Sequence, residues 1–513
     1  MAWEEGYVVD TTYTYGYYSE MSPQRVDYGL LLAGLDPLPP GPCCELGFGQ
    51  GVTLNLSAAA EPERRWWGTD FNPTQARFAR DLAASAGTRA ELSDQSFLEF
   101  CARDDLPEFS LIALHGVWSW ISRENQRVIL EFIRRRLAIG GVLQVSYNTP
   151  HGWAAMVPIR HLFVEHARAT GLRSMSSSDR MQRAIEYVAK VLETNPRYLS
   201  MNPSAKPKLE AMSAHAAAYL PHEYLNADWN LTTFAEMSRE LEEAKLTYAG
   251  NGSLLERIDA LHLDDAQRKF LAEIPDPALR ETTREFITDT TFRRDYWIKA
   301  PTRTPERRHA SSMEGVTYVL AALPDKVPKD VKCARGKWDL NPDIYQPLVT
   351  LLAAQQGPIS RAEIGERIAG EKKITVGQVS QALAILVAIG AVHPAQPESA
   401  RRRAAPFCVD LNSRILQLSA DNYRVAHLVS PVSGLGVAVD LGTQLILGAK
   451  RAGLSSPERI AHFAHEAMTG QNLPLRVNDQ AVDDPAVAIE KLTVIAANFD
   501  RIMAPVFQRL GIL

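Results

Sequence analysis

Cysteine is scarce in this sequence, with five residues among 513. Cys43 and Cys44 are adjacent in an apolar run and the others are scattered, so the sequence contains neither a disulfide framework nor a zinc-binding CxxC motif. We therefore expect thiols with a structural role in a reducing compartment, and no metal site.

Long hydrophobic runs are also missing, because no apolar stretch reaches the roughly 18–20 residues that cross a bilayer. The first residues, Met-Ala-Trp-Glu-Glu, are acidic and lack the apolar region of a signal peptide. These absences predict a cytoplasmic protein with no membrane span.

Charge of one sign is not in excess, since 55 Lys and Arg residues stand against 60 Asp and Glu residues. The net charge of −5 excludes a general attraction to nucleic acid or acidic lipid. Hydrophobic residues make up 46% of the chain and charged residues 22%, as in soluble globular proteins. The length favours roughly two to four domains, and the sequence contains no apparent internal repeat.

Short apolar runs alternate with amphipathic stretches over the first 150 residues, which is typical of an α/β domain with a parallel sheet. The expected strands follow Pro42 and cover 65–70, 90–94, 110–115 and 142–147. The expected helices cover 52–60, begin at 72–73 and cover 123–137, with Gly140 and Gly141 closing the last. Two later runs, 246–250 and 293–299, are candidates to complete the sheet.

The remaining sequence is mostly helical in pattern. Expected helices cover 161–170, 179–193, 231–244, 359–368, 375–389 and 486–507, and expected loops cover 202–207 and 301–312. The order of elements after residue 359 suggests a winged-helix-like module. Its second helix, 375–389, contains no Lys or Arg, which argues against DNA recognition, and we expect no nucleic-acid partner.

The sharpest motif is Glu-Leu-Gly-Phe-Gly-Gln-Gly, residues 45–51, which lies between an expected strand and an expected helix. Glycines there let the backbone come close to a ligand. A dinucleotide-binding loop would end in Gly or Ala at the position of Val52. The loop therefore departs from the nicotinamide-binding pattern.

Two acidic residues at later strand ends add to this motif. Asp70 follows the second expected strand, where a carboxylate can accept both ribose hydroxyls. Asp94, followed by Gln95, Ser96 and Phe97, ends the third strand at a position suited to the edge of an adenine ring. With Glu45, three acids at successive strand ends are expected to face one crevice.

The spacing resembles the class I methyltransferases that use S-adenosylmethionine (SAM). The resemblance implies that Gly47, Gly49 and Gly51 hold the methionine part of SAM, and that Glu45 orients the loop and the amino group. It further implies that Asp70 binds ribose and Asp94 contacts adenine. The predicted SAM-binding residues are Tyr13, Tyr17, Glu45, Gly47, Gly49, Gly51, Asp70, Phe71, Asp94, Gln95, Ser96, Phe97 and His115.

Four further segments narrow the resemblance: residues 13–19, 114–122, 146–153 and 219–229. Together they resemble bacterial methyltransferases with a methyltransferase regulatory domain, a family that includes lysine methyltransferases of rickettsial outer-membrane proteins. The implied fold class is α/β, with a Rossmann-like class I methyltransferase sheet, a helical insertion, and smaller winged-helix-like and α+β C-terminal domains.

The expected domains follow from this resemblance and from the composition of the chain. They are a SAM-binding core (1–155), a helical insertion and candidate dimerisation element (156–221), a segment that completes the methyltransferase domain (222–300), a linker (301–335), a winged-helix-like domain (336–400) and a C-terminal domain (401–513). A homodimer is accordingly one expected assembly.

The end of the fourth expected strand is the usual position of acceptor-side residues in this family. Trp118 and Trp120 are expected to enclose the aliphatic stem of a lysine, and Tyr147 and Asn148 to supply a hydroxyl and a carbonyl oxygen. His115 is either a general base or a residue that packs or contacts the cofactor.

Glu223 has two interpretations. It belongs either to a loop that enters a helix capped by Asp228 or Asn230, or to a lid in which its carboxylate takes a proton from an incoming amine. The predicted catalytic residues are therefore His115, Trp118, Tyr147, Asn148 and Glu223.

The predicted function is a SAM-dependent methyltransferase that acts on lysine side chains of a protein. One alternative is a methyltransferase of small molecules or saccharides, and another is a SAM-binding adaptor without turnover. A narrow closed pocket would favour the small molecule, whereas an open trench beside Trp118 would favour the protein.

Overall fold

The computed structural model describes residues 6–11, 13–171, 174–212, 219–369, 374–422, 424–477 and 480–513. Residues 1–5, on which the prediction about a signal peptide depends, lie outside the described residues. Within the described ranges, no helix combines the length and apolar character needed to cross a membrane. The same ranges contain no group of three His, Cys, Asp or Glu side chains suited to a metal ion.

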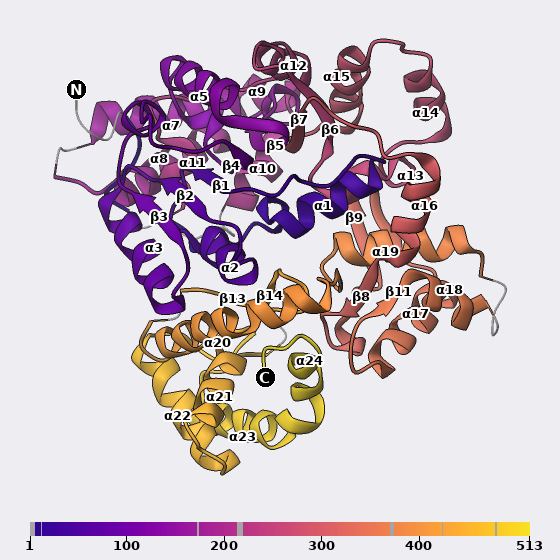
Figure 1. Cartoon of the computed structure of the whole chain (residues 1–513). Helices are drawn as coiled ribbons and strands as arrows, with labels where there is room; N and C mark the ends of the chain where they lie inside the picture. Colours follow the sequence, from indigo (N-terminus) through magenta and orange to yellow (C-terminus); the bar gives the residue numbers. More distant parts are fainter. Residues whose placement is uncertain are drawn as a thin grey trace.

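A seven-stranded sheet forms the centre of the N-terminal half, in the order β3-β2-β1-β4-β5-β7-β6 (Figure 1). The strands are β1 (Cys43–Leu46), β2 (Trp66–Thr69), β3 (Ala90–Ser93), β4 (Phe109–Leu114), β5 (Leu137–Asn148), β6 (Leu246–Asn251) and β7 (Phe292–Lys299). The first five pair in parallel, and β7 runs antiparallel to both β5 and β6. The two later runs thus complete a Rossmann-like sheet, as predicted.

Helices cover both faces of this sheet, which explains its nearly continuous apolar strands. Successive side chains point to opposite faces, so Cys43 and Trp66 pack in one core, and Cys44 and Trp67 in the other. The first core lies against α1 (Pro23–Leu32), α2 (Val52–Ala60) and α3 (Pro73–Ala86), and the second against α4 (Phe97–Cys101), α5 (Arg123–Arg136) and α12 (Phe234–Glu243).

The start of β5 differs from the prediction. Gly140 and Gly141 were expected to close the preceding helix, but the chain enters the strand directly at Leu137. Leu137 pairs with Phe109 and Val142 with Leu111, so the residues between them form a bulge. Gly140 takes a positive φ of 76°, which allows this bulge.

A helical insertion follows β5 and has its own apolar core around Trp153, Phe163 and Met181. Its helices are α6 (Pro150–Trp153), α7 (Val157–Thr170), α8 (Ser177–Glu193), α9 (Arg197–Met201), α10 (Ala205–Met212) and α11 (Leu220–Tyr224). The two predicted helices correspond to α7 and α8. The loop predicted over 202–207 is shorter, because α10 begins at Ala205.

The helix expected from Leu231 begins three residues later. Thr233 caps α12 in a capping box with Glu236, so the predicted caps, Asp228 and Asn230, are wrong. Asn230 instead donates a hydrogen bond to the Ile121 carbonyl. Between β6 and β7 the chain forms α13 (Asp259–His262), α14 (Asp265–Ala272) and α15 (Pro277–Thr288).

The segment expected to be a linker, 301–335, contains regular structure. β8 (Thr317–Leu320) is the central strand of a three-stranded sheet with β11 (Ile359–Ser360) and β12 (Val392–Pro394). Other elements of this region are α16 (Glu306–Gly315), β9 (Asp330–Cys333), β10 (Gly336–Asp339), α17 (Pro342–Ala354), α18 (Arg361–Ala369) and α19 (Val376–Ala388). The unit around β8 therefore begins before residue 336, and its assignment as winged-helix-like stays a prediction.

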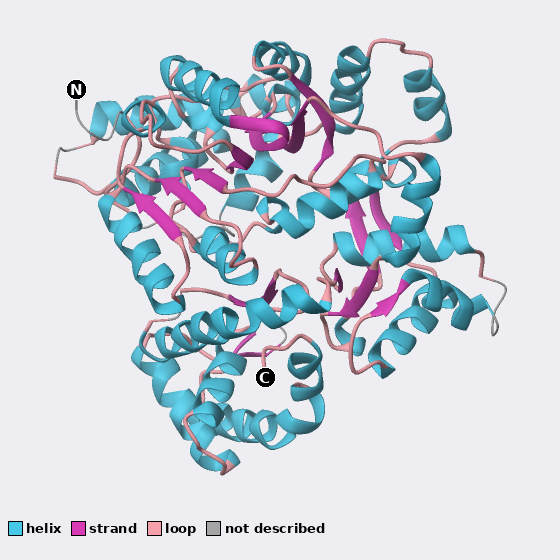
Figure 2. Ribbon diagram, viewed as in Figure 1, coloured by secondary structure: helices cyan, strands magenta, loops and turns pink. Residues whose placement is uncertain are grey.

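The C-terminal part is mainly helical (Figure 2). It consists of α20 (Glu398–Asp421), β13 (His427–Val429), β14 (Gly436–Ala438), α21 (Leu441–Arg451), α22 (Pro457–Gly470), β15 (Arg476–Val477), β16 (Gln480–Ala481), α23 (Pro485–Ile502) and α24 (Ala504–Arg509). The last predicted helix is thus divided into α23 and α24.

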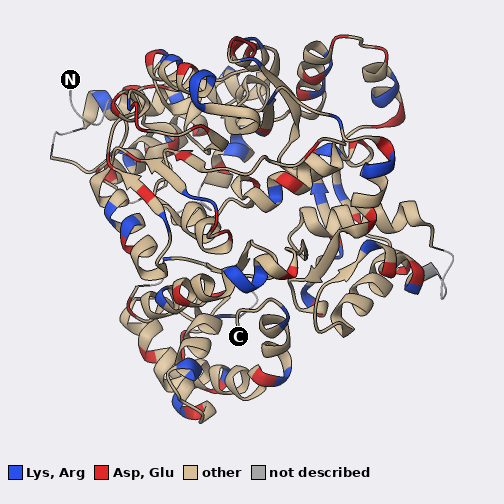
Figure 3. Ribbon diagram, viewed as in Figure 1, with Lys and Arg blue, Asp and Glu red and all other residues tan. Residues whose placement is uncertain are grey.

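One apolar cluster joins the C-terminal part to the sheet domain. It contains Leu56 of α2, Leu82 of α3, Leu411 and Ile415 of α20, and Phe499 of α23, all nearly or fully buried. In Figure 1, α20 lies along α2 and α3. Charged residues of both signs are spread over every part of the chain (Figure 3).

Candidate active site

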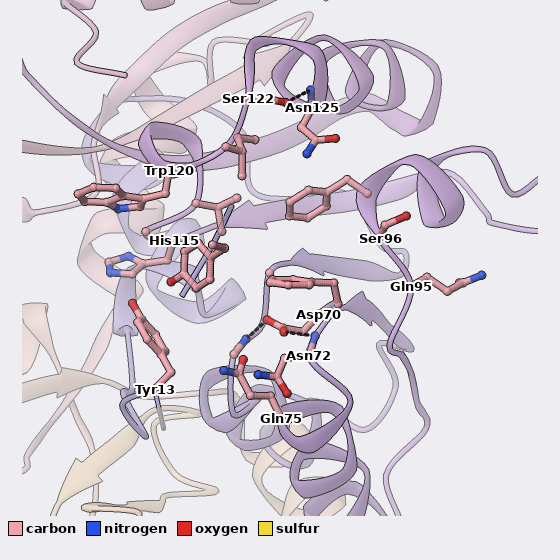
Figure 4. Close-up of a pocket in the computed structure, with 18 residues that line it drawn as sticks. Tyr13, Asp70, Asn72, Gln75, Gln95, Ser96, His115, Trp120, Ser122 and Asn125 are labelled. Carbon is pink, nitrogen blue, oxygen red and sulfur yellow. Dashed lines mark hydrogen bonds between the residues drawn. The ribbon is translucent and has the colours of Figure 1, made fainter. Parts of the chain in front are cut away.

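A cavity opens at the carboxyl ends of β1, β2 and β4 (Figure 4). This is where ligands bind in open α/β sheets, because loops diverge there from neighbouring strands. The lining residues are Tyr7, Tyr13, Gly47, Gly49, Asp70, Phe71, Asn72, Gln75, Gln95, Ser96, Phe97, His115, Gly116, Val117, Trp120, Ile121, Ser122 and Asn125.

The glycine loop follows β1 and turns into α2. Gly47 has a φ of 73° and Gly51 a φ of 66°, both in the left-handed region that favours glycine. A methyl group on Gly47 would lie 2.5 Å from Val117, and one on Gly51 would lie 2.5 Å from Ala79. The loop therefore needs glycine at these positions for close packing as well as for its turn.

Asp70 holds this loop at the floor of the cavity. Its carboxylate accepts hydrogen bonds from the amides of Gly49, at 2.8 Å, and Asn72, at 3.1 Å. Burial raises the pKa of Asp70 to about 7, although both amide hydrogen bonds oppose the shift. The carboxyl group is placed between the glycine loop and the start of α3, beside the cavity.

The three predicted acids do not all face the cavity. Glu45 lies beneath the loop, and its pKa is raised well above the usual range by burial and by the nearby Asp70. Asp94 points away, into an ion pair of 2.8 Å with Arg80 in which both side chains are about half exposed. The residues after Asp94 line the cavity in its place, as Gln95 and Ser96 do in Figure 4.

Phe97 also lines the cavity, and Ser96 caps α4 through a capping box with Glu99. Gly51 and Glu45 are not among the lining residues; they shape the loop from behind. Gly51 and Asp94, which were predicted to contact the ligand, do not line the cavity, and Glu45, which was predicted to orient the loop and the amino group, lies behind the loop.

At one end of the cavity, His115 lies between Trp120 and Tyr13 (Figure 4). Trp120 belongs to the short 3-10 turn η2 (Trp118–Trp120) that follows β4. Its ring stacks on Trp229, with centroids 6.2 Å apart and an interplanar angle of 14°. This end is aromatic, whereas Gln95 and Ser96 mark the opposite end (Figure 4).

Trp118 does not line the cavity. It is 1% exposed and packs in the apolar core with Ile129 and Phe132 of α5. The two tryptophans differ because the tight turn sends one side chain inward and leaves the other at the cavity. Of the two tryptophans predicted to enclose the acceptor, Trp118 does not reach the cavity and Trp120 lines it.

Tyr147 and Asn148 also lie outside the cavity. The Tyr147 hydroxyl donates to Asp295 at 2.8 Å in the sheet, where the tyrosine is fully buried. Burial raises the pKa of Tyr147 well above its usual range. The backbone amide of Asn148 donates to Ser119 Oγ. Both residues therefore stabilise the end of β5, and neither offers a group to a ligand in the cavity.

The N-terminal segment covers the cavity from outside the sheet. Tyr7 and Tyr13 line it, and the Thr11 hydroxyl lies 2.8 Å from Nε2 of His222 in α11. The Tyr13 ring packs edge-on against His222 at 5.1 Å. Burial lowers the pKa of His222 to about 4, which keeps this contact uncharged at neutral pH.

Tyr17 departs from its predicted role. Its hydroxyl lies 3.2 Å from Ser22 Oγ, and its ring packs beside His427 and Gly436 of the C-terminal part. Tyr17 therefore belongs to an interface between domains. Of the two tyrosines predicted to contact the cofactor, only Tyr13 lines the cavity described above.

Glu223 lies in α11 and not in a loop, behind the tyrosines of the N-terminal segment. The Tyr219 hydroxyl donates to Glu223 Oε2 at 2.7 Å. Burial raises the pKa of Glu223 to about 7; burial is also the main cause of the raised pKa values of Tyr7 and Tyr13, to which the charge of Glu223 adds. Glu223 is thus an electrostatic neighbour of the cavity, although it is not among the lining residues.

Several lining residues were not predicted: Tyr7, Asn72, Gln75, Gly116, Val117, Ile121, Ser122 and Asn125. Two of them have a sequence signal. Asn72 caps α3 shortly after β2 ends, and Ser122 caps α5 after the 3-10 turn that follows β4, so both begin a helix. Tyr7 has no such signal, because tertiary contacts bring it to the site.

Known proteins resemble this chain in sequence and fold. Residues 216–299 match the family described as "Predicted methyltransferase regulatory domain". The Synechocystis protein sll1526 is 33% identical over 520 residues, with both chains covered completely. The protein RP028 of Rickettsia prowazekii is 31% identical over 202 residues, which cover 38% of this chain and 77% of that protein.

A solved structure has the same fold along nearly the whole chain. It is PKMT2 from Rickettsia typhi in complex with AdoHcy, with a TM-score of 0.69 and 18% identity. The similarity covers 97% of this chain and 100% of that one. The fold therefore extends beyond the sheet domain to the helical insertion and the C-terminal elements.

Proposed function

The chain belongs to the family of class I methyltransferases that carry a methyltransferase regulatory domain, and we propose that it transfers a methyl group from SAM to lysine side chains of a protein. The observation that carries the proposal is the position of Asp70. Its carboxylate anchors the glycine loop and the start of α3 at the floor of a cavity at the strand ends.

The residues of the cavity suit each part of SAM. The closely packed backbone around Gly47 and Gly49 suits the methionine part, and Asp70 suits the ribose hydroxyls. Phe71, Gln95, Ser96 and Phe97 offer an aromatic surface and polar groups for the adenine. AdoHcy, which is bound to the R. typhi PKMT2, supports this proposal through a chain of the same fold.

The aromatic end of the cavity suits a cationic acceptor. When bound, SAM supplies an electrophilic methyl group on a sulfonium ion. Tyr13 and Trp120 can face a lysine stem and a developing cation through their ring surfaces. Orientation and exclusion of water provide most of the acceleration in such a displacement.

A lysine acceptor must lose a proton before it attacks. His115 lines the cavity, and Glu223 lies behind Tyr7 and Tyr13 with a pKa of about 7. Glu223 can take up a proton near neutral pH, whereas His115 is the group that reaches the cavity surface. The resemblance to the lysine methyltransferases of rickettsial outer-membrane proteins supports the choice of lysine over other acceptors.

Calorimetric titration of the full chain with SAM, with NAD as the comparison, tests the first part of the proposal. We expect one SAM site per chain and no NAD binding. Asp70→Ala should remove SAM binding, whereas Asp81→Ala, which changes an exposed carboxylate on α3, should keep it. Binding of NAD, or of neither compound, would contradict the cofactor assignment.

Transfer of labelled methyl groups to proteins of a bacterial lysate tests the acceptor. Hydrolysis of the labelled protein should release methyllysine, and the Asp70→Ala chain should label nothing. Label in small molecules or saccharides would replace the lysine proposal by the first alternative. SAM binding without any label would favour the adaptor.

A further inference from the structure

The environment of His115 is built from three distant parts of the chain. Tyr18 stacks on the imidazole, with centroids 3.6 Å apart and an interplanar angle of 21°. Phe292 of β7 meets the same ring edge-on at 5.7 Å. Contacts on both sides fix the plane of the imidazole, although stacking alone does not decide which ring nitrogen carries the proton.

A buried carboxylate lies beside one nitrogen of this ring. Oε1 of Glu20 is 3.3 Å from Nδ1 of His115, and both side chains are about a tenth exposed. At this distance the two atoms form an ion-pair contact, and Nδ1 of His115 has no hydrogen-bond partner among the described residues. Glu20 is thus the group able to receive a hydrogen bond from Nδ1–H.

Glu20 is itself held in place by β7. Nε of Arg294 lies 2.9 Å from Oε1 of Glu20, and the Tyr296 hydroxyl donates to the Glu20 carbonyl at 2.7 Å. Burial alone would raise the pKa of Glu20, but His115 and Arg294 outweigh it and lower the pKa to about 2. The carboxylate therefore stays charged throughout the neutral range.

We propose that Glu20 is a positioning residue for His115: it accepts the Nδ1–H bond, so that Nε2 of the neutral imidazole is left as the free acceptor at the aromatic end of the cavity. This deepens the proposed function, because that nitrogen would receive the proton of the acceptor amine. Carboxylates orient histidines in the same way in many enzymes, where they select the tautomer and fix the ring.

The proposal also gives a physical meaning to the segment matched as a regulatory domain. Phe292, Arg294 and Tyr296 all lie within residues 216–299, and each contacts His115 or Glu20. Tyr18, Glu20 and Arg294 further line a second cavity of about 750 Å³ between the sheet domain and the later domains. The segment thus completes the surroundings of the histidine from outside the glycine-loop region.

The tautomer of His115 can be measured directly by ¹⁵N NMR of the full chain labelled at histidine. His115→Gln identifies the signal, and the measurement needs neither SAM nor a methyl acceptor. We expect a neutral His115 with the proton on Nδ1. Glu20→Ala should move the proton in part to Nε2, and Glu20→Asp should restore at least part of the Nδ1–H form.

Glu61→Gln is the matched control, because Glu61 forms a partly buried ion pair of 2.7 Å with Arg64 at the carboxyl end of α2. It should leave the His115 signals unchanged. A proton on Nε2 in the unmodified chain, or identical His115 signals in the chain with Glu20→Ala, would overturn the proposal.

The two proposals can fail separately. A chain that shows the Nδ1–H form and its dependence on Glu20, but does not bind SAM, would keep the positioning role and refute the methyltransferase assignment. Where methyl transfer is measured, Glu20→Ala should lower kcat at least tenfold and change the KM for SAM less than threefold. If Glu20→Ala impaired kcat and the KM for SAM to the same extent, that result would also contradict a role of Glu20 through His115.

Discussion

Leu411 offers a sharp test of how the C-terminal helices are joined to the catalytic domain. It lies on α20, is fully buried, and shares an apolar cluster with Leu56 of α2 and Leu82 of α3. Leu411→Ala removes three buried carbon atoms and leaves a cavity. Such substitutions lower the free energy of unfolding by about 2–5 kcal/mol.

Because the cluster is continuous, the substitution should lower the stability of the structure on both sides of the interface. Denaturant unfolding should be followed by far-ultraviolet circular dichroism, to which the helices of the C-terminal part contribute, and by SAM binding at each denaturant concentration. We expect both midpoints to move down together. Leu279→Ala, at a side chain that is 56% exposed, should change the free energy of unfolding by less than about 0.5 kcal/mol.

This reasoning would be refuted if the Leu411→Ala chain unfolded in two separate transitions and its SAM-binding midpoint did not change. That result would mean that the C-terminal part folds and unfolds on its own. The cluster predicts instead that removal of residues 398–513 exposes α2 and α3 and yields a poorly soluble chain.

Three other outcomes follow from the site. Asp94→Ala should change SAM affinity less than tenfold, because the Asp94 carboxylate is ion-paired and half exposed. Asp70→Ala should instead abolish SAM binding while the fold is retained. Calorimetry measures the binding of both variants, and circular dichroism checks their fold. Trp118→Ala should lower the free energy of unfolding by about 3–5 kcal/mol, while Trp120→Ala should mainly lower methyl transfer; equal destabilisation would contradict their different positions. Glu223 has a folded-state pKa raised from 4.5 to about 7, so the folded chain binds its proton more tightly than the unfolded chain and loses stability as pH rises from about 5 to 7. The free energy of unfolding should therefore fall by about 3 kcal/mol between pH 5 and pH 8 in the unmodified chain. Glu223→Gln should abolish this fall, and an unchanged pH dependence in the variant would contradict the assignment.

The sheet was predictable because its strands are buried on both faces and appear in the sequence as short apolar runs. The glycine loop and Asp70 were predictable for a related reason: both directly follow strands, and the ends of parallel strands meet at one edge. β8 was missed because it is a four-residue strand after a polar stretch, and its partners β11 and β12 come more than thirty residues later.

The errors at the site have a common physical cause. Residues 118–120 form a 3-10 turn, and composition alone does not tell which of two tryptophans faces the core. The direction of Asp94 depends on Arg80, which reaches it from α3. Tyr7 and Glu20 lie in an N-terminal stretch whose place is set by contacts with α11 and β7, more than 200 residues away. Such contacts leave no periodic signal in the sequence.

The N-terminal segment over the cavity has a kinetic consequence. Tyr7 and Tyr13 cover the cavity, while the neighbouring Val8 and Thr11 are bonded to Asn226 and His222. If a molecule bound there leaves past Tyr7 and Tyr13, these bonds must break first, and entry of fresh cofactor and departure of spent cofactor then share one opening step. The strength of the contacts between the segment and the 222–226 region would then set the residence time of the cofactor, and turnover would follow the rate of release more than the rate of methyl transfer.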